Sequence, residues 1–461
     1  MRVPLDRAIA ASGATLVDGA AAPATLRIGT DTRSIEPGDT FVALHGERFD
    51  GNDFAAEAVR RGAALLVLDR PAARVAGVPA MLVERTDRAY MAFARVAREL
   101  FDGLVVAVTG SAGKTTTKAF LTQLCAAQYG DRVLASPGNE NNEIGVSKLL
   151  LDASNEAHDI VIAEMGARQH GDIAILVDIA RPHVGILTNI GEAHVEIMGS
   201  RERLAETKWA LFSRGASAVL NADDEVSIAR APMLPQLPSW FAAVASEPAP
   251  QLRRAFEPLT ALVGERRLLV CERGVRSEYE IATHVPGLHN RVNLAAAIAG
   301  ARRLGVSLER LIPEIPALQL PPGRYDRLSI EGGPRVIYDA YNANASGMIA
   351  ALDAFAGETA SRRIAVLASM AELGDESQSL HERVGAHAAG KVDVLLVGGD
   401  FATALARGAR RAGLDASHIV LIRNNSHAAA WLREHATGDD AILLKGSRKY
   451  KLEEIVEELY A

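Results

Sequence analysis

Short apolar runs that alternate with helical segments are the feature that most constrains the fold of this chain. Three such runs follow one another between residues 104 and 191, and each ends in a glycine-containing turn: "LVVAVTG" (104–110), "DIVIAEMG" (159–166) and "HVGILTNIG" (183–191). Strands that are apolar on both faces are typical of a parallel sheet covered by helices on both sides. The sequence therefore predicts a central α/β domain.

The same alternation occurs before and after this region. In the first hundred residues, "TFVALHG" (40–46) and "AALLVLD" (63–69) read as strands, with the amphipathic segment "FAAEAVRRG" (54–62) between them. After "PALQLPPGRYDR" (316–327), a proline-rich candidate linker, the alternation restarts with "RVIYD" (335–339), which we expect to be the first strand of a third domain.

We predict an α/β protein of three domains. A small N-terminal α/β domain covers residues 1–102, the central parallel-sheet domain 103–318, and a Rossmann-like doubly wound domain 319–461. Within the central domain, residues 232–282 are rich in proline and arginine and carry only short strands, whereas 289–305 predict a helix with a glycine stop.

Composition excludes several classes of protein. Hydrophobic residues make up 48% of the 461 residues and charged residues 23%, as in ordinary globular proteins. The net charge of −7 argues against nucleic-acid binding. Two isolated cysteines, Cys125 and Cys271, fit a reducing compartment. With no secretory signal and no apolar run of about 18 residues, we expect a soluble cytoplasmic protein without a membrane span.

A glycine-rich loop lies between the first central strand and the helix after it. In "TGSAGKTT" (109–116), Gly110 and Gly113 allow the backbone to turn its N–H groups inward, and the following helix adds its positive end. Lys114 would reach the β- and γ-phosphates of a nucleotide, and the Thr115 hydroxyl would bind Mg²⁺. The loop is shorter than the common Walker A pattern, which places a glycine where this chain has Val108. A glycine turn with a chance GKT is the alternative.

Two further groups follow neighbouring strands. Glu164 ends "DIVIAE", and His194 comes shortly after "HVGILTNIG". Because the carboxyl ends of parallel strands meet at one edge of a sheet, we expect both to lie near Thr115. A carboxylate, an imidazole and a hydroxyl, together with phosphate oxygens, can hold one or two divalent metals. Each residue taken alone could equally be an ordinary strand-end or loop residue.

Asparagines gather in two other loops. "SPGNENNEIGV" (136–146) contains three of them, and "IYDAYNANASGM" (337–348) repeats the theme after the strand at 335–339. Asparagine both donates and accepts hydrogen bonds, so these loops suit a polar substrate, a nucleotide sugar or a base. "KGSRK" (445–449) adds cations suited to a carboxylate or phosphate. A solvated turn remains the alternative for 136–146 and for 445–449.

Taken together, these motifs resemble the Mur ligase family of cell-wall synthesis over nearly the whole chain. The matching motifs are, in order, TGxxGKT, GNxNNEIG, EMGA, TNIGEAH, HN, GR, DxYNAN, AELG and KGSR. Within the family, "GNENNEIGV" and "DAYNANASGM" are most similar to the branch that adds D-alanyl-D-alanine to UDP-N-acetylmuramoyl-tripeptide. The resemblance implies that ATP phosphorylates the substrate carboxylate and that the amine of the dipeptide then attacks the acyl phosphate.

The resemblance also implies roles for individual residues. Lys114, Glu164, His194 and Lys208 would be catalytic, with two Mg²⁺ held by Thr115, Glu164, His194 and Lys208, the last as a carbamate formed from CO₂. From composition alone, Lys208 is an ordinary helix-surface lysine. The residues implied to bind ATP are Gly110, Ser111, Ala112, Gly113, Lys114, Thr115, Thr116, Asn290, Arg324, Asp339 and Asn342.

The implied substrate contacts extend over all three domains. "DTRSIEPGDTFVALHGERFDGNDF" (31–54) is similar to the family's uridine-nucleotide motif. The implied contacts with the UDP-muramoyl-tripeptide and the dipeptide are Thr32, Arg33, Gly46, Arg48, Asp50, Asn52, Asn139, Asn141, Asn142, Asn344, Lys445 and Arg448. We expect a monomer.

Several positions depart from the family pattern. Asn52 replaces a frequent histidine, Ala345 replaces the proline of YNANP, and Ala368 and Ser369 replace the Gly-Asp of LGDM. The last three lie in the third domain, which receives the incoming amine. A relative that joins a different amino acid or dipeptide therefore stays open. Folate polyglutamylation is disfavoured by the N-terminal domain, and a P-loop nucleotide switch by the short loop and the substrate asparagines.

Overall fold

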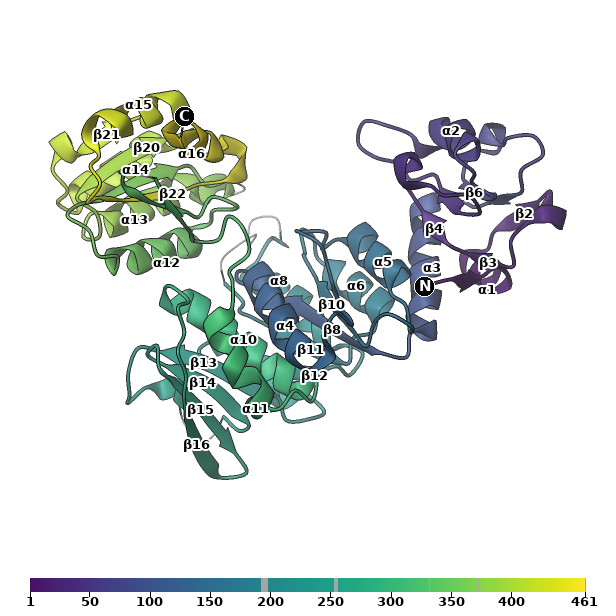
Figure 1. Ribbon diagram of the computed structural model, residues 1–461, viewed down its shortest axis with the longest axis horizontal. Helices are drawn as coiled ribbons and strands as arrows, with labels where there is room; N and C mark the ends of the chain where they lie inside the picture. Colours follow the sequence, from purple (N-terminus) through teal and green to yellow (C-terminus); the bar gives the residue numbers. More distant parts are fainter. Residues whose placement is uncertain (192–197, 253–255, 331, 372, 461) are drawn as a thin grey trace.

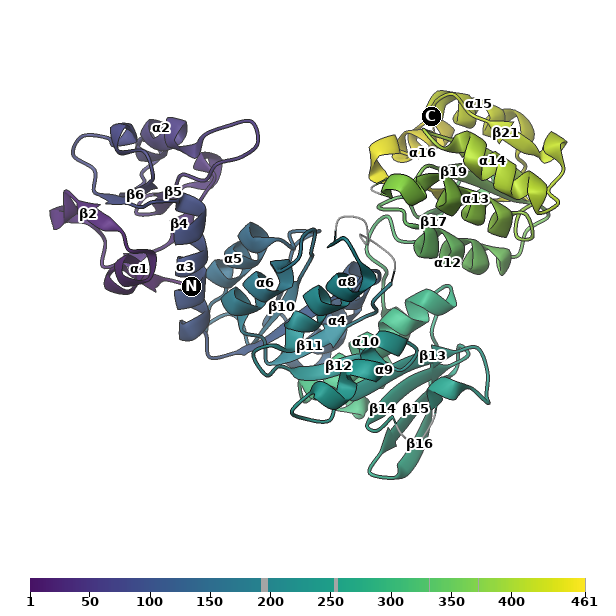
Figure 2. The ribbon, with the colours of Figure 1, turned by 180° about the vertical axis from the view of Figure 1, so that it is seen from behind.

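The chain folds into three α/β units, each with its own sheet (Figure 1). The computed structural model describes residues 1–191, 198–252, 256–330, 332–371 and 373–460. Seen from either side, the central unit lies between the two terminal ones, with the N-terminal unit attached through helix α3 (Figure 2). No helix in these ranges is long and apolar enough to cross a membrane.

The N-terminal unit is built on a five-stranded sheet of order β2-β7-β6-β5-β4, in which only β2 runs antiparallel to its neighbour. Its strands are β2 (Thr15–Val17), β4 (Ile28–Gly29), β5 (Thr40–Val42), β6 (Leu65–Leu68) and β7 (Ala80–Leu82). A two-stranded sheet pairs β1 (Val3–Pro4) with β3 (Thr25–Leu26), and the first two helices are α1 (Leu5–Ser12) and α2 (Ala55–Arg60).

Helix α3 (Thr86–Leu100) joins the N-terminal unit to the central one. It packs against α1 on one side and against α5 and α6 of the central unit on the other. Its buried residues, including Tyr90, Phe93 and Val96, therefore cover a wider part of the helix surface than the single apolar stripe of a surface helix. Arg95 Nε donates to Asp178 (2.7 Å), and Arg98 Nε donates to the Ala180 carbonyl (2.8 Å) at the end of α6. The two units thus share one hydrophobic core.

The central unit contains a nine-stranded sheet of order β16-β15-β14-β13-β12-β11-β8-β10-β9. Its strands are β8 (Leu104–Thr109), β9 (Val133–Ala135), β10 (Ile160–Glu164), β11 (Val184–Leu187), β12 (Ser217–Asn221), β13 (Ser239–Val244), β14 (Leu259–Val263), β15 (Arg267–Glu272) and β16 (Val275–Glu280). The helices are α4 (Lys114–Tyr129), α5 (Glu143–Asp152), α6 (Asp172–Ala180), α8 (Arg201–Trp209), α9 (Glu225–Arg230), α10 (Leu288–Arg303) and α11 (Leu308–Leu311).

Strand β8 explains why the sheet is covered on both faces. Val106 and Val108 join the core under α4 and α10, whereas Val105 and Ala107 point into the core under α3, α5 and α6. All four side chains are fully buried, as the uninterrupted apolar run predicted. The stretch 232–282 contains short strands, as the sequence indicated: β13 and β14 extend the parallel sheet, and β15 and β16 close it as an antiparallel edge.

The C-terminal unit has a six-stranded sheet of order β17-β18-β22-β19-β20-β21, parallel except for β17. The strands are β17 (Asp326–Ser329), β18 (Arg335–Tyr338), β19 (Arg363–Ala368), β20 (Val394–Gly398), β21 (Ile419–Leu421) and β22 (Ala441–Lys445). Helices α12 (Ala345–Ala356), α13 (Ser377–Ala388) and α14 (Ala402–Arg411) cover one face, and α15 (Asn425–His435) and α16 (Glu453–Tyr460) the other. This is the predicted doubly wound domain. The expectation that 335–339 form its first strand is wrong, because β17 precedes them.

Candidate active site

The glycine-rich loop connects β8 to α4 at the carboxyl edge of the central sheet. Gly110 and Gly113 have φ values of +152° and +82°, a region that other residues rarely adopt. Lys114 is the first residue of α4, and its Nζ donates to the Gly110 carbonyl (2.9 Å). Burial lowers the pKa of Lys114, and the positive charge of Arg324 lowers it further, while Glu164 opposes the shift. The first-turn N–H groups of α4 have no intrahelical partner and face the ligand side of the loop, as a phosphate site requires.

We expect Gly110→Ala to weaken ATP binding about tenfold or more, because strained backbone costs about 1–3 kcal/mol. A Cβ at position 110 would lie 1.8 Å from Thr188 Oγ1, so the loop or the neighbouring strand end must move. Gly130→Ala is the matched control: Gly130 ends the same helix with a φ of +56°, but its Cβ would meet open space. Calorimetric titration with ATP compares the two variants, and equal affinities would contradict the expectation.

A cleft opens between this loop, the start of α10 and the C-terminal unit. Its lining combines side chains that are far apart in the sequence: Ser111, Ala112, Gly113, Lys114, Thr115, Thr116, His289, Asn290, Asn293, Arg324, Tyr325, Asp339, Asn342, Asn344, Gly347 and Lys445. Ten of the eleven residues expected to bind ATP lie here, and the eleventh, Gly110, immediately precedes Ser111. Asn344 and Lys445, which we assigned to the substrates, line the same cleft.

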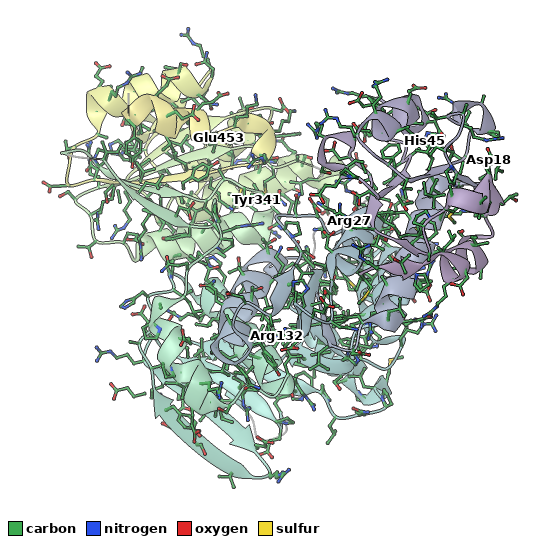
Figure 3. All side chains as sticks on the ribbon, turned by 45° about the vertical axis from the view of Figure 1, so that its right-hand side comes forward. Asp18, Arg27, His45, Arg132, Tyr341 and Glu453 are labelled. Carbon is green, nitrogen blue, oxygen red and sulfur yellow. The ribbon has the colours of Figure 1, made fainter. Side chains whose placement is uncertain are left out.

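An aromatic ring between two guanidinium groups forms the C-terminal side of this region. The Arg324 guanidinium lies 4.6 Å from the centre of the Tyr341 ring, and that of Arg448 lies 5.6 Å from it. Figure 3 shows Tyr341 on the side of the C-terminal unit that faces the central one. At these distances both cations are within the range of a cation–π interaction with the ring, which favours keeping them beside it.

A buried ion pair joins the ends of β18 and β22. Lys445 Nζ lies 3.1 Å from Asp339 Oδ2 and donates to the Asn342 carbonyl (2.9 Å). Burial lowers the pKa of Lys445, against the attraction of Asp339. Lys445 is therefore engaged within the protein, where it holds Asp339 and the asparagine loop in place.

Glu164 gathers the oxygen donors expected for a metal. It is 1% exposed at the end of β10; Thr115 Oγ1 (3.3 Å) and Asn141 Nδ2 (2.9 Å) both donate to its Oε1. Its Oε2 lies 3.2 Å from Lys118 Nζ but accepts no hydrogen bond from a described residue. Magnesium commonly uses one or two carboxylates, a hydroxyl and substrate phosphates, so this arrangement fits it. In the described ranges, no three His, Cys, Asp or Glu side chains are placed to hold a metal by themselves.

Lys208 is buried on α8 rather than exposed on a helix surface. It is 2% exposed, and among the described residues it has no ion-pair or hydrogen-bond partner for its Nζ. Burial lowers its pKa to about 7, and the nearby charge of Lys114 contributes. With a pKa of about 7, roughly half of the amine is neutral at pH 7. The neutral amine is a nucleophile and is the state that reacts with CO₂. His194, the other expected metal ligand, lies outside the described residues.

The asparagines of the loop before α5 have separate surroundings. Asn142 caps α5, since its side chain accepts a hydrogen bond from Gly145 N (2.9 Å). Asn141 holds Glu164, and Asn139 is exposed. In the later loop, Asn344 likewise caps α12 by accepting from Gly347 N (2.7 Å). Because the cap anchors this helix start, Ala345 in place of proline leaves the turn ordered.

The residues assigned to the uridine nucleotide lie in the N-terminal unit and do not line the cleft. Asn52 is buried and donates to both Asp50 and Asp69 (2.8 Å each), so it fixes its own loop. Asp50 also pairs with Arg70 (3.1 Å). By contrast, Arg33 is exposed and pairs with Asp31 (2.6 Å), two residues before it. Thr32, Gly46 and Arg48 lie in the same two loops, which present polar groups to solvent.

Several residues of the site escaped the sequence analysis. His289, Asn293, Tyr325 and Gly347 line the cleft. Asn293 follows Asn290 by three residues on α10, a spacing that places both on one helix face. Burial lowers the pKa of His289 to about 4, against the attraction of Asp339, so its imidazole is neutral at physiological pH. The helical spacing could have indicated Asn293, whereas Tyr325 and Gly347 depend on how the domains meet.

The fold and the site together define a P-loop nucleotide-binding protein whose loop is covered by a Rossmann-like domain. Three family models match it: "Mur ligase family, catalytic domain" over residues 27–98, "Mur ligase middle domain" over 108–301, and "Mur ligase, glutamate ligase domain" over 323–448. The chain belongs to the Mur ligase family.

Relatives of this family match almost the full length of the chain. A UDP-N-acetylmuramoyl-tripeptide–D-alanyl-D-alanine ligase of Synechocystis sp. is 35% identical over 438 residues, covering 94% of this chain and 91% of the relative. The crystal structure of MurF from Acinetobacter baumannii has a TM-score of 0.85 at 26% identity and covers 100% of this chain and 99% of that one. The MurF ligase from Thermotoga maritima in complex with ADP has a TM-score of 0.78 at 28% identity, covering 94% and 97%.

Proposed function

We propose that this protein is the ATP-dependent ligase that joins D-alanyl-D-alanine to UDP-N-acetylmuramoyl-tripeptide, forming ADP and phosphate. One observation carries the proposal: the P-loop and the motif residues of the C-terminal unit line a single cleft in a chain whose curated relatives perform this reaction. Synthesis of a precursor from a UDP-linked substrate fits action in the cytoplasm. We also propose that the protein is a monomer, and light scattering can measure this oligomeric state.

The reaction proceeds in two transfers. An oxygen of the tripeptide carboxylate attacks the γ-phosphorus of ATP, the bond to the β-phosphate oxygen breaks, and ADP leaves. The dipeptide amine then attacks the carbonyl carbon of the acyl phosphate, loses a proton, and expels inorganic phosphate as the amide bond forms. Activation is needed because a carboxylate is a poor electrophile toward amines. Catalysis therefore consists mainly of positioning and charge stabilisation rather than a protein nucleophile.

The residues of the cleft supply these two functions. Lys114 and the first-turn amides of α4 would hold the β- and γ-phosphates, and Arg324 would add a cation from the C-terminal side. Asn290, Asp339 and Asn342 would bind the adenosine. Binding of ATP between two domains also excludes water from the acyl phosphate, which would otherwise hydrolyse.

Thr115 and Glu164 would hold Mg²⁺, which when bound neutralises the charge of the phosphates. For a second ion we propose His194 and Lys208 as ligands. The amine of Lys208 is buried, its pKa is about 7, and no described residue pairs with it, which supports conversion to a carbamate. A carbamate would also replace repulsion from Lys114 by attraction.

Residues of the other units would bind the two remaining substrates. The half-buried Thr32 and the exposed Arg33 and Arg48 of the N-terminal unit would contact the uridine nucleotide. The incoming dipeptide would approach from the C-terminal unit. There Ser369, which replaces the family's aspartate, is buried: its Oγ donates to the Gly398 carbonyl (3.2 Å) and accepts from Phe401 N (2.8 Å).

Phosphate release from ATP tests the proposed function. We expect release that requires both UDP-N-acetylmuramoyl-tripeptide and D-alanyl-D-alanine, with a product that contains both. Single amino acids and L-alanyl-L-alanine serve as matched controls. Stimulation by another amine, but not by the dipeptide, would replace the substrate assignment with that of a related ligase. No stimulation by any amine would contradict ligase activity.

A further inference from the structure

The glycine-rich loop is shorter than the common P-loop and needs support from outside itself. Only two residues separate Gly110 from Gly113, whereas the Walker A pattern places four between its glycines. A shorter loop has fewer N–H and C=O groups of its own with which to stabilise its turn. Thr188 and Asn189, which directly follow β11, supply these missing partners.

Asn189 accepts hydrogen bonds from two consecutive backbone amides of the loop. Its Oδ1 accepts hydrogen bonds from Ser111 N (3.1 Å) and Ala112 N (3.0 Å). Its backbone carbonyl also accepts from Ser111 N (3.0 Å). One side-chain oxygen therefore fixes the direction of both N–H groups in the middle of the loop.

Thr188 contacts the loop as a hydrogen-bond donor, whereas Asn189 accepts from it. Its Oγ1 donates to the Ala112 carbonyl (2.6 Å), and its backbone N donates to the Thr109 carbonyl (2.9 Å). This last bond continues the parallel pairing of β11 with β8 beyond the strand ends. Thr188 is 1% exposed and occupies the space that a side chain at position 110 would need. A reverse bond runs from Gly191 N to Ser111 Oγ (3.0 Å).

We propose that Thr188 and Asn189 are positioning residues that take the place of the missing part of the P-loop. They engage the Ser111 and Ala112 backbone, which leaves the first-turn amides of α4 directed at the phosphates. Neither side chain lines the cleft described above, so they act through the loop and not on the nucleotide. The inference rests on the proposed function in that ATP is taken as the ligand.

Asn189→Ala in the full-length protein is the first test. We expect its Kd for ATP, measured by calorimetry without acceptor substrates, to rise about tenfold, because the two partly buried hydrogen bonds to Asn189 Oδ1 are lost. Hydrogen exchange at Ser111 and Ala112 should become faster, and the KM for ATP should change more than kcat. If Asn189 instead competed with phosphate for these amides, the variant would bind ATP more tightly. Tighter or unchanged binding would overturn the proposal.

A second pair of variants keeps the test decisive if Asn189→Ala folds poorly. Thr188→Val removes the hydroxyl but keeps the shape, whereas Thr188→Ser keeps the hydroxyl. We expect Thr188→Val to bind ATP about threefold or more weakly than Thr188→Ser, as the loss of one hydrogen bond predicts. Equal affinities would refute the role of Thr188. Because these titrations need no acceptor, a wild-type protein that binds ATP but forms no amide would contradict only the proposed function.

Discussion

Lys208→Ala is expected to lower kcat by about two to three orders of magnitude while the protein stays folded, the range seen when preorganised charge is removed from an active site. The reason is the state of this side chain. Its amine is buried, has no partner among the residues that the structure describes, and has its pKa lowered to about 7. Such a group becomes useful in a metal- and phosphate-binding site once it carries the negative charge of a carbamate.

The matched variant is Lys208→Met, which is also uncharged but fills most of the space of the lysine. Acetate or another short carboxylate should partly restore activity to the alanine variant, because that variant leaves room for an anion. It should not restore the methionine variant. Two outcomes would remove the carbamate from the proposed function. The first is full activity of Lys208→Ala. The second is that carboxylates rescue neither variant and bicarbonate has no effect on the activity of the wild type.

The pH dependence provides a readout independent of turnover. CO₂ reacts with the neutral amine, and Lys208 is neutral above its pKa of about 7 and protonated below it. The carbamate signal in spectra recorded with isotope-labelled bicarbonate should therefore be strong above pH 7 and weaken as the pH falls through that value. An exposed lysine has a much higher pKa and is protonated near neutral pH, so it would react little with CO₂ there.

Much of the fold could be predicted because buried parallel strands leave a strong signal in the sequence. The segments 104–108, 160–163 and 441–444 are wholly apolar, and a sheet that is covered on both faces accommodates such strands. Strand β16, by contrast, reads "VRSEYE" and alternates exposed charges with partly covered residues at a sheet edge. Such an edge strand depends on pairing with β15, a tertiary contact that composition does not reveal.

The site was predictable where one short motif contains the chemistry, and less so where it depends on burial. The loop at 109–116 and Glu164 follow from their positions at strand ends. Lys208 does not, because the charged residues that precede it on α8 are typical of an exposed helix surface, and only the packing of α8 shows that its amine is enclosed. The contacts of Asn189 could not be predicted for a similar reason. Its side chain accepts hydrogen bonds from the backbone N–H groups of Ser111 and Ala112, which lie in the loop after β8 and are distant in sequence.

Lys445→Met is expected to destabilise the C-terminal unit by about 3–5 kcal/mol, the usual cost of leaving one partner of a buried ion pair alone. The lysine is 3% exposed, and its Nζ lies 3.1 Å from Asp339 Oδ2. Without it the carboxylate loses its ion-pair partner, and the Asn342 carbonyl loses its donor as well. Both losses fall on the ends of β18 and β22, at the wall of the nucleotide cleft.

Hydrogen exchange at the amides of β18 and β22 measures this effect locally in the full chain, where unfolding of three units is not a single transition. The double variant Asp339→Asn with Lys445→Met is the matched control, because it removes both charges and should recover much of the loss. ATP affinity should fall in both variants, since Asp339 lines the cleft. If the single variant exchanged as slowly as the wild type, the ion pair would contribute little to stability. If the double variant were less stable than the single one, the unpaired carboxylate of Asp339 would not be the source of the loss.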